Sequence, residues 1–158
     1  MIEPTEPEHL DEAVRALTRS ARMLDRALPD ISMADFRMLS AISDGIDRAS
    51  RLAGMLALGK PAVSATVDSL VRRGLLARQT REDDRRAVDL ALTDRGARTL
   101  QDARAALAGV VLDIAGHTPD AEATLAALAV FGEGVRARHQ ERRAARENGT
   151  CAGSEAAR

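Results

Sequence analysis

The sequence predicts an α+β fold that is mostly helical, and three patterns support this prediction. Apolar residues over 8–28 recur at an average spacing of 3.5 residues, which is typical of a helix that packs lengthwise against another helix. Between 76 and 92 the period changes from helical to two, which indicates a β-hairpin. Residues 93–146 then return to a helical pattern.

The first helix is expected over 8–28, where Pro29 ends it. Its apolar positions alternate steps of four and three residues, so they form one seam along the helix. The seam residues are Leu10, Val14, Leu17, Ala21, Leu24 and Leu28.

Three shorter helices are expected at 33–43, 51–57 and 60–73. Each begins with a residue that suits a helix N-terminus, because a hydroxyl can cap the first turn and proline lacks the N–H that would stay unpaired there. These residues are Ser32, Ser50 and Pro61, and Gly74 is suited to end the last helix.

Two strands, 76–80 and 88–92, flank a charged tip at 81–86. A fifth helix is expected from a Thr93 cap to about 116, and a sixth opens at Thr118-Pro119 and extends to about 146. Three helices followed by a hairpin are the order of a winged helix-turn-helix. A helix of about 14 residues is long enough to lie in a DNA major groove.

We therefore expect one domain over residues 1–146. Its helical dimerisation lobe comes from 8–28 and 93–146, and its winged lobe covers 32–92. Residues 147–158 are polar, small and glycine-containing, which predicts a disordered tail.

The distribution of charge favours a nucleic-acid partner for the middle of the chain. Residues 48–98 carry 11 basic and 6 acidic side chains, whereas residues 1–47 carry 5 basic and 10 acidic ones. A basic segment between acidic or neutral flanks suits a surface that faces phosphates, although a solvated charged surface has the same composition.

Composition argues against several other classes of protein. No apolar run is long enough for a membrane helix, and the acidic N-terminus is not a signal peptide, so we expect a cytoplasmic protein without a membrane partner. The single Cys151 and three scattered histidines predict neither a disulfide nor a metal site. No catalytic set or phosphate loop occurs at a meaningful spacing, so we expect no cofactor and no enzyme activity.

The segments Arg51-Leu52-Ala53, Lys60-Pro61-Ala62-Val63-Ser64 and Leu70-Val71-Arg72-Arg73-Gly74-Leu75-Leu76-Ala77-Arg78 resemble the DNA-binding stretch of the MarR family. The tip is similar to that family's wing signature: Asp84-Arg85-Arg86, five further residues, then Leu92-Thr93. The resemblance covers about residues 10–145. Two positions depart from it, since Ala65 replaces a longer polar side chain and Gly59 replaces a capping serine.

The resemblance implies a homodimeric transcriptional regulator that binds a palindromic double-stranded DNA site. It also implies a repressor that releases DNA when a small aromatic or phenolic effector binds between its lobes. By analogy with relatives, the effector residues are Phe36, Arg37 and Ser40. The predicted DNA-binding residues are Ser50, Lys60, Pro61, Ala62, Ser64, Ala65, Thr66, Ser69, Arg72, Arg81, Asp84, Arg85 and Arg86.

Roles within this set follow from side-chain chemistry. Polar side chains on the fourth helix can read base edges, and the methyl groups of Ala62 and Ala65 can contact thymine. Asp84 is expected to orient Arg86 toward a phosphate or a narrow minor groove. Because Ala62 and Ala65 weaken the set of base-reading groups, a helical protein-interaction module whose wing no longer binds DNA remains an alternative. A small all-helical enzyme is a second one.

Overall fold

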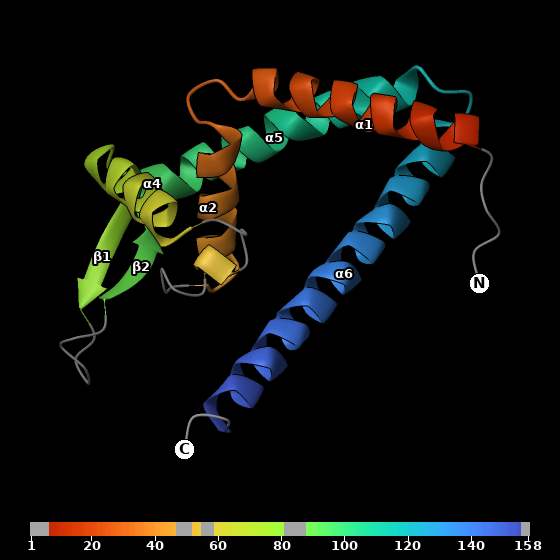
Figure 1. Ribbon diagram of the computed structural model, residues 1–158. Coiled ribbons are helices and arrows are strands. Elements are labelled where there is room, and N and C mark those ends of the chain that lie inside the picture. Colours follow the sequence, from red (N-terminus) through yellow and green to blue (C-terminus); the bar gives the residue numbers. More distant parts are fainter. Residues whose placement is uncertain (1–6, 47–51, 55–58, 81–87, 156–158) are drawn as a thin grey trace.

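The computed structural model describes residues 7–46, 52–54, 59–80 and 88–155. Its elements in chain order are α1 (Pro7–Ala27), α2 (Met33–Ser43), α4 (Lys60–Arg72), β1 (Leu76–Thr80), β2 (Val88–Leu92), α5 (Asp94–Gly116) and α6 (Ala121–Glu155). Figure 1 shows a winged lobe of α2, α4 and the hairpin at one end of α5. Helix α1 lies along α5, and α6 projects from the other end. The predicted class, α+β and mostly helical, is confirmed.

The hydrophobic core lies in the winged lobe, where α2, α4, the hairpin and the start of α5 meet. Its fully buried side chains are Met38, Leu39, Leu52, Val63 and Leu70. Leu52 belongs to the short helical segment 52–54, and the remainder of the helix expected at 51–57 lies outside the described residues. Burial of each large apolar side chain contributes about 1.5–3 kcal/mol. The core therefore holds one face of α4 against the lobe and leaves the opposite face free.

Helix α4 ends in a turn that sends the chain directly into β1. Gly74 has a φ of +69°, a conformation that side chains with a Cβ rarely adopt. The Gly74 N–H donates to the Val71 carbonyl at 2.9 Å, and the Leu75 N–H donates to the Leu70 carbonyl at 2.9 Å. These two bonds form a Schellman motif. The predicted end of the helix at Gly74 therefore matches the backbone.

The hairpin has the register that the alternating sequence predicts. Leu76 lies opposite Leu92, and Arg78 lies opposite Leu90. Leu76 and Leu90 are both buried against the core. Because side chains alternate faces along a strand, Arg78 shares the face of Leu76 and needs a polar partner beside the lobe.

A close contact joins the hairpin to α5. The Thr93 hydroxyl caps α5 by accepting from the Gly96 N–H at 3.0 Å, and it donates to the Gly74 carbonyl at 2.7 Å. A Cβ atom at Gly96 would collide with the backbone oxygen of Leu75. Glycine is therefore required at Gly96, where α5 packs directly on the turn that leaves α4.

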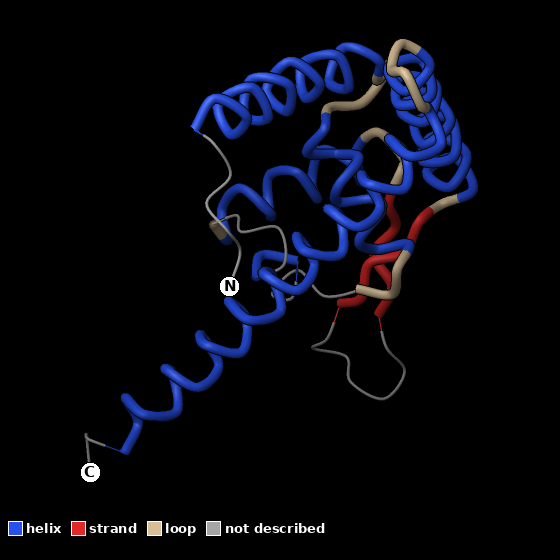
Figure 2. The backbone as a smooth tube through the Cα atoms, turned by 90° about the vertical axis from the view of Figure 1, so that its right-hand side faces the viewer, coloured by secondary structure: helices blue, strands red, loops and turns tan. Residues whose placement is uncertain are grey.

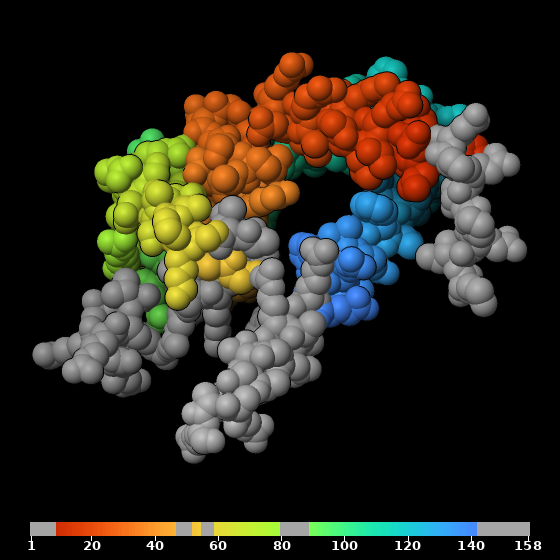
Figure 3. Space-filling view, viewed as in Figure 1, coloured from red at the N-terminus to blue at the C-terminus, as the bar shows by residue number. Residues whose placement is uncertain are grey.

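Helices α1, α5 and α6 leave a large apolar surface uncovered in the single chain. Leu10 is 59% exposed, Phe131 is 55% exposed and Val130 is 68% exposed. Figure 3 shows α1 and the described part of α6 bordering an open hollow, and Figure 2 shows from a second direction that α6 stands away from the winged lobe. The exposed large apolar residues of these helices are Leu10, Val14, Leu17, Met23, Leu112, Leu128, Val130, Phe131 and Val135.

Helix α6 differs from the prediction at both ends. It begins at Ala121 instead of Thr118, since the Asp120 carboxylate caps it by accepting from the Ala123 N–H at 2.9 Å. The helix continues to Glu155, and the disordered tail expected over 147–158 stays a prediction. The cost of helix nucleation is already met upstream, and each of the two glycines in this extension costs only about 1 kcal/mol.

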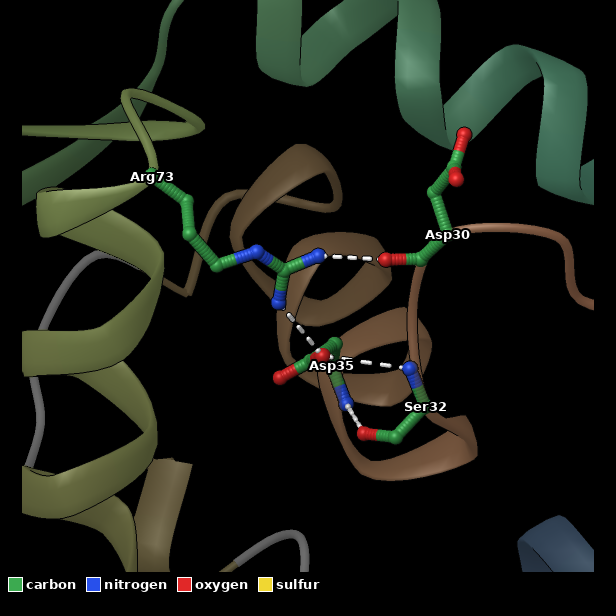
Figure 4. Close-up of polar contacts among 4 residues, drawn as sticks. All are labelled: Asp30, Ser32, Asp35 and Arg73. Carbon is green, nitrogen blue, oxygen red and sulfur yellow. Dashed lines mark hydrogen bonds and ion pairs between the residues drawn. The ribbon is translucent and has the colours of Figure 1, made fainter.

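An ion pair connects the end of α4 to the beginning of α2 (Figure 4). One guanidinium nitrogen of Arg73 donates to the Asp35 carboxylate at 2.9 Å, and the other donates to the Asp30 carbonyl at 2.6 Å. The same Asp35 oxygen accepts from the Ser32 N–H at 3.1 Å and so completes the capping box of α2. We call this arrangement the Asp35–Arg73 brace.

The first prediction concerns the stability of this brace. Arg73→Gln and Asp35→Asn should each lower the free energy of unfolding by about 1–2 kcal/mol, because each leaves a partly buried charged partner with fewer hydrogen bonds. The double variant should lose at least about 0.5 kcal/mol less than the sum, since both changes remove one interaction. Urea unfolding of the four proteins measures the coupling.

Arg104→Gln is the matched control for the brace. Arg104 reaches Asp44 at 3.9 Å, and both side chains are at least half exposed, so its loss should change stability by less than about 0.5 kcal/mol. Strictly additive losses in Arg73→Gln and Asp35→Asn would show that the brace contributes no coupling.

Candidate nucleic-acid interface

Helix α4 presents a free face of small and polar side chains. Val63, Val67 and Leu70 bury the opposite face in the core. The exposed residues of the first turns are Lys60, Pro61, Ala62, Ser64 and Ala65. These predicted DNA-binding residues therefore lie together on one accessible part of the helix. Their small size lets another surface approach the α4 backbone closely.

The first turn of α4 is suited to contact with an anion. Gly59 at the N-cap supplies no side-chain hydrogen bond to the helix, and Pro61 stands in the first turn. The positive end of the helix dipole and the Lys60 ammonium therefore act at the same place. Gly59 therefore leaves this end of the helix to backbone groups.

Thr66 and Ser69 are less accessible than the first-turn residues, since both are half-buried. The Thr66 hydroxyl donates to the Ala62 carbonyl at 2.9 Å, so its proton is already engaged within the helix. Thr66 can offer an acceptor or its methyl group to a base, but its hydroxyl is not a free donor in this conformation. Lys60 and Ser64 are therefore the best-placed donors of the predicted set.

An ion pair ties the free helix to the hairpin. The Arg78 guanidinium on β1 donates to the Asp68 carboxylate on α4 at 2.6 Å. Both side chains are about half exposed, so the energy of the pair is small, but it joins the two elements of the candidate interface. We did not predict this pair from the sequence. The signal in the sequence was the position of Arg78 two residues after Leu76, because this spacing places both side chains on the same face of the strand.

Arg72 lies at the opposite end of α4 from Lys60. The helix has 13 residues, and at 1.5 Å per residue it spans about 20 Å. Arg72 is exposed in the last turn, where any cation favours the negative end of the helix dipole. The structure therefore does not bring Arg72 into the group of first-turn residues, and its assignment to DNA contact stays a prediction.

The remaining predicted DNA-binding residues lie outside the described residues. They are Ser50, Arg81, Asp84, Arg85 and Arg86. The two strands that lead to the tip are described, and their antiparallel pairing continues to Thr80 and Val88. The wing assignments therefore stay predictions that rest on sequence spacing.

The predicted effector residues all lie on α2, but they do not share one environment. Phe36 is partly buried against the core, Arg37 is exposed and Ser40 is half-buried. The two pockets described among the placed residues are lined by other side chains, one near Arg72 and the other on α6. The effector assignment is therefore still only a prediction.

The described residues also bear on membrane insertion and metal binding. None of the described helices is both long and apolar enough to cross a membrane. Within the same residues, no group of three or more His, Cys, Asp or Glu side chains is placed to hold a metal ion.

Comparison with known proteins identifies the winged lobe. The model of the MarR family matches residues 30–87. No curated protein sequence matches the chain. The matched residues cover α2, α4 and β1 of the winged lobe.

Solved structures share the whole fold. The transcriptional regulator BldR from Sulfolobus solfataricus is 25% identical, with a TM-score of 0.63 over 84% of this chain and 99% of its own. Wild-type MarR from E. coli is 23% identical, with a TM-score of 0.65 over 84% and 98%. BpsR from Bordetella bronchiseptica is 21% identical, with a TM-score of 0.63 over 86% and 96%.

These comparisons agree with the motifs of α4 and the wing and with the order of the helices around them. The residues that match the family model, 30–87, contain α2, α4 and β1, which also belong to the fold shared with the solved structures. The winged lobe therefore matches the MarR family model, and the chain has the winged helix-turn-helix fold of the solved regulators BldR and MarR.

Proposed function

We propose that this protein is a homodimeric transcriptional regulator that binds a palindromic double-stranded DNA site and acts as a repressor. The observation that carries the proposal is the free face of α4, held on a rigid core beside the hairpin. Such a regulator works where the DNA lies, which we expect to be the cytoplasm. It needs neither a cofactor nor an enzyme activity.

The dimensions of α4 suit this role. Its length of about 20 Å and the small side chains at Ala62 and Ala65 allow it to enter a major groove about 12 Å wide. Its first turn, with Lys60 and the positive end of the dipole, then meets a phosphate, and Ser64 meets a base edge. The hairpin follows the DNA backbone toward the neighbouring minor groove.

The need for a second copy follows from the uncovered helices. The exposed side chains of α1 include Leu10, Val14 and Leu17, which are the first residues of the predicted seam. A seam with a period of 3.5 residues is typical of a helix that packs lengthwise against another helix. Helix α5 covers only part of α1, so part of this seam stays uncovered in the single chain. A second copy offers the same apolar helices in a symmetric arrangement. It also sets two α4 helices at a fixed spacing, as a palindromic site requires.

Release by a small molecule is supported by a relative. BpsR has its DNA binding regulated by 6-hydroxynicotinic acid. We propose that an aromatic or phenolic effector acts on this protein in the same sense, with Phe36, Arg37 and Ser40 on α2 as its contacts. An effector there would act directly on the helix that packs against α4.

A protein-interaction module without DNA binding is the second candidate. The observation that favours it is the small number of free donors on α4, since Ala62 and Ala65 are apolar and the Thr66 proton is engaged. DNA binding separates the two candidates because only a DNA-binding protein shows an affinity that falls steeply with salt.

The second prediction tests DNA binding. Wild-type protein should bind duplexes selected from a random pool, and its affinity should fall linearly with salt on logarithmic axes. Lys60→Gln should weaken binding and lower the salt slope by about one, because one phosphate contact is lost. Arg22→Gln removes the same charge from α1, outside the winged lobe, and should leave the slope unchanged. If no duplex is enriched, or if the affinity for the duplex is insensitive to salt, the interaction-module candidate replaces the proposal.

The third prediction tests the dimer. Wild-type protein should be a dimer at micromolar concentration, and Leu17→Asp should give a folded monomer. Leu17 is 47% exposed in the single chain, so the charge disturbs the partner surface and not the core of the winged lobe. Light scattering measures the mass and circular dichroism checks the fold. Arg22→Asp, which lies outside the apolar seam of α1, should remain dimeric. A monomeric wild-type protein under these conditions would contradict the proposed homodimer.

The fourth prediction tests the wing pair, which lies outside the described residues. Arg86→Ala should weaken binding to specific and random duplexes alike and lower the salt slope by about one. Asp84→Ala raises the net positive charge, yet it should also weaken binding if Asp84 orients Arg86. The double variant should then be little worse than Arg86→Ala, because both losses share one contact. Tighter binding by Asp84→Ala would mean that the pair does not act as one unit.

A further inference from the structure

A polar cavity of about 550 Å³ lies where the winged lobe meets α5. It is lined by residues from three parts of the chain: the end of α4, the first turns of α5 and the loop between α1 and α2. The volume is within the range of small-molecule sites. The lining residues are Asp30, Arg72, Arg73, Leu75, Arg95 and Thr99.

The cavity is strongly basic for its size. Three guanidinium groups and one carboxylate, that of Asp30, line it. Arg73 spends both of its terminal nitrogens on Asp35 and on the Asp30 carbonyl, so the brace fixes its position and balances its charge. Within the described part of the chain, Arg72 and Arg95 form no ion pair. With the Asp30 carboxylate counted against Arg72 and Arg95, the lining keeps an excess of one positive charge in a chain whose overall net charge is −1.

Apart from Arg72, whose contact with DNA stays a prediction, the cavity is remote from the residues that we assign to DNA. Leu75 immediately precedes β1 and Arg95 closely follows β2, so the cavity lies at the base of the hairpin. A five-residue strand, about 16 Å long, separates this base from the tip at 81–86. Arg72 is about 18 Å along α4 from Lys60. The occupant is therefore better sought among small molecules than in the DNA backbone.

We propose that this cavity binds a small anion through a phosphate or carboxylate group. Arg72 and Arg95 donate to its oxygens in the paired geometry that guanidinium groups favour, and Thr99, one helical turn beyond Arg95, adds a hydroxyl donor. Arg73 contributes a fixed positive charge to the lining. None of the predicted effector residues on α2 takes part.

The test uses the full chain with inorganic phosphate and with succinate as separate probes. Isothermal titration at constant ionic strength should show saturable binding of at least one probe by the wild-type protein. Arg72→Gln and Arg95→Gln should each weaken that binding about tenfold or more, because each removes charged hydrogen bonds to the anion. Both side chains are exposed, so these variants should fold, and circular dichroism checks this.

Two further variants sharpen the result. Arg98→Gln removes an exposed arginine from the same helix but not from the cavity, and it should bind the probe as the wild type does. Thr99→Val should weaken binding by a smaller factor than either arginine variant. Binding of neither probe, or equal weakening by Arg98→Gln and Arg95→Gln, would overturn the proposal. A fall of about one in the DNA salt slope of Arg95→Gln would assign the cavity to DNA phosphates and would overturn it as well.

Discussion

One oxygen of the Asp35 carboxylate connects the parts of the winged lobe that must keep a fixed relation. It accepts from the Ser32 N–H, which starts α2, and from the Arg73 guanidinium, which ends α4. Arg73 in turn holds the carbonyl of Asp30, in the loop that follows α1. The core holds one face of α4 against the lobe, but hydrophobic contact has no direction and adds no specific constraint at the helix end. Directional hydrogen bonds at the C-terminal end of α4 add that constraint, while the Arg78–Asp68 pair joins the same helix to the hairpin.

A second constraint comes from the chain's distribution of apolar surface. The winged lobe buries its large side chains within one chain, whereas α1, α5 and α6 leave theirs exposed. The winged lobe therefore has its core covered within one chain, whereas α1, α5 and α6 keep a large apolar surface exposed. In the proposed dimer, a second copy covers the exposed helices and positions two winged lobes without altering their cores. The same distribution of apolar surface explains why α6 stands away from the rest in Figure 1.

Much of the fold was predictable, because the determining signals are local. The capping Ser32, the end at Gly74 and the alternation around Leu76 and Leu90 each act within a few residues, and each was found at the expected place. The interactions that position α4 were not predictable in this way. Arg73 and Asp35 are 38 residues apart, and nothing in the local sequence selects this arginine among its neighbours. Likewise, an exposed Ser64 and a half-buried, internally bonded Thr66 look alike as sequence. The wing tip carried the most specific motif, yet its residues lie outside the described part of the chain.

Arg73 belongs both to the Asp35–Arg73 brace and to the lining of the cavity at the base of the hairpin. Its guanidinium is shared between the brace and the cavity wall, so an anion in the cavity and the Asp35 carboxylate act on the same cation. In the proposed complex, the anion competes with Asp35 for the positive charge of Arg73 while the guanidinium keeps its place in the brace, so each interaction changes the strength of the other. Such coupling must be reciprocal for the two binding free energies, and couplings of this kind are typically about 1–3 kcal/mol. That is comparable to the strength expected of the charged hydrogen bonds of the brace. A change in one arginine's partners is therefore sufficient in magnitude to link the cavity to the orientation of α4.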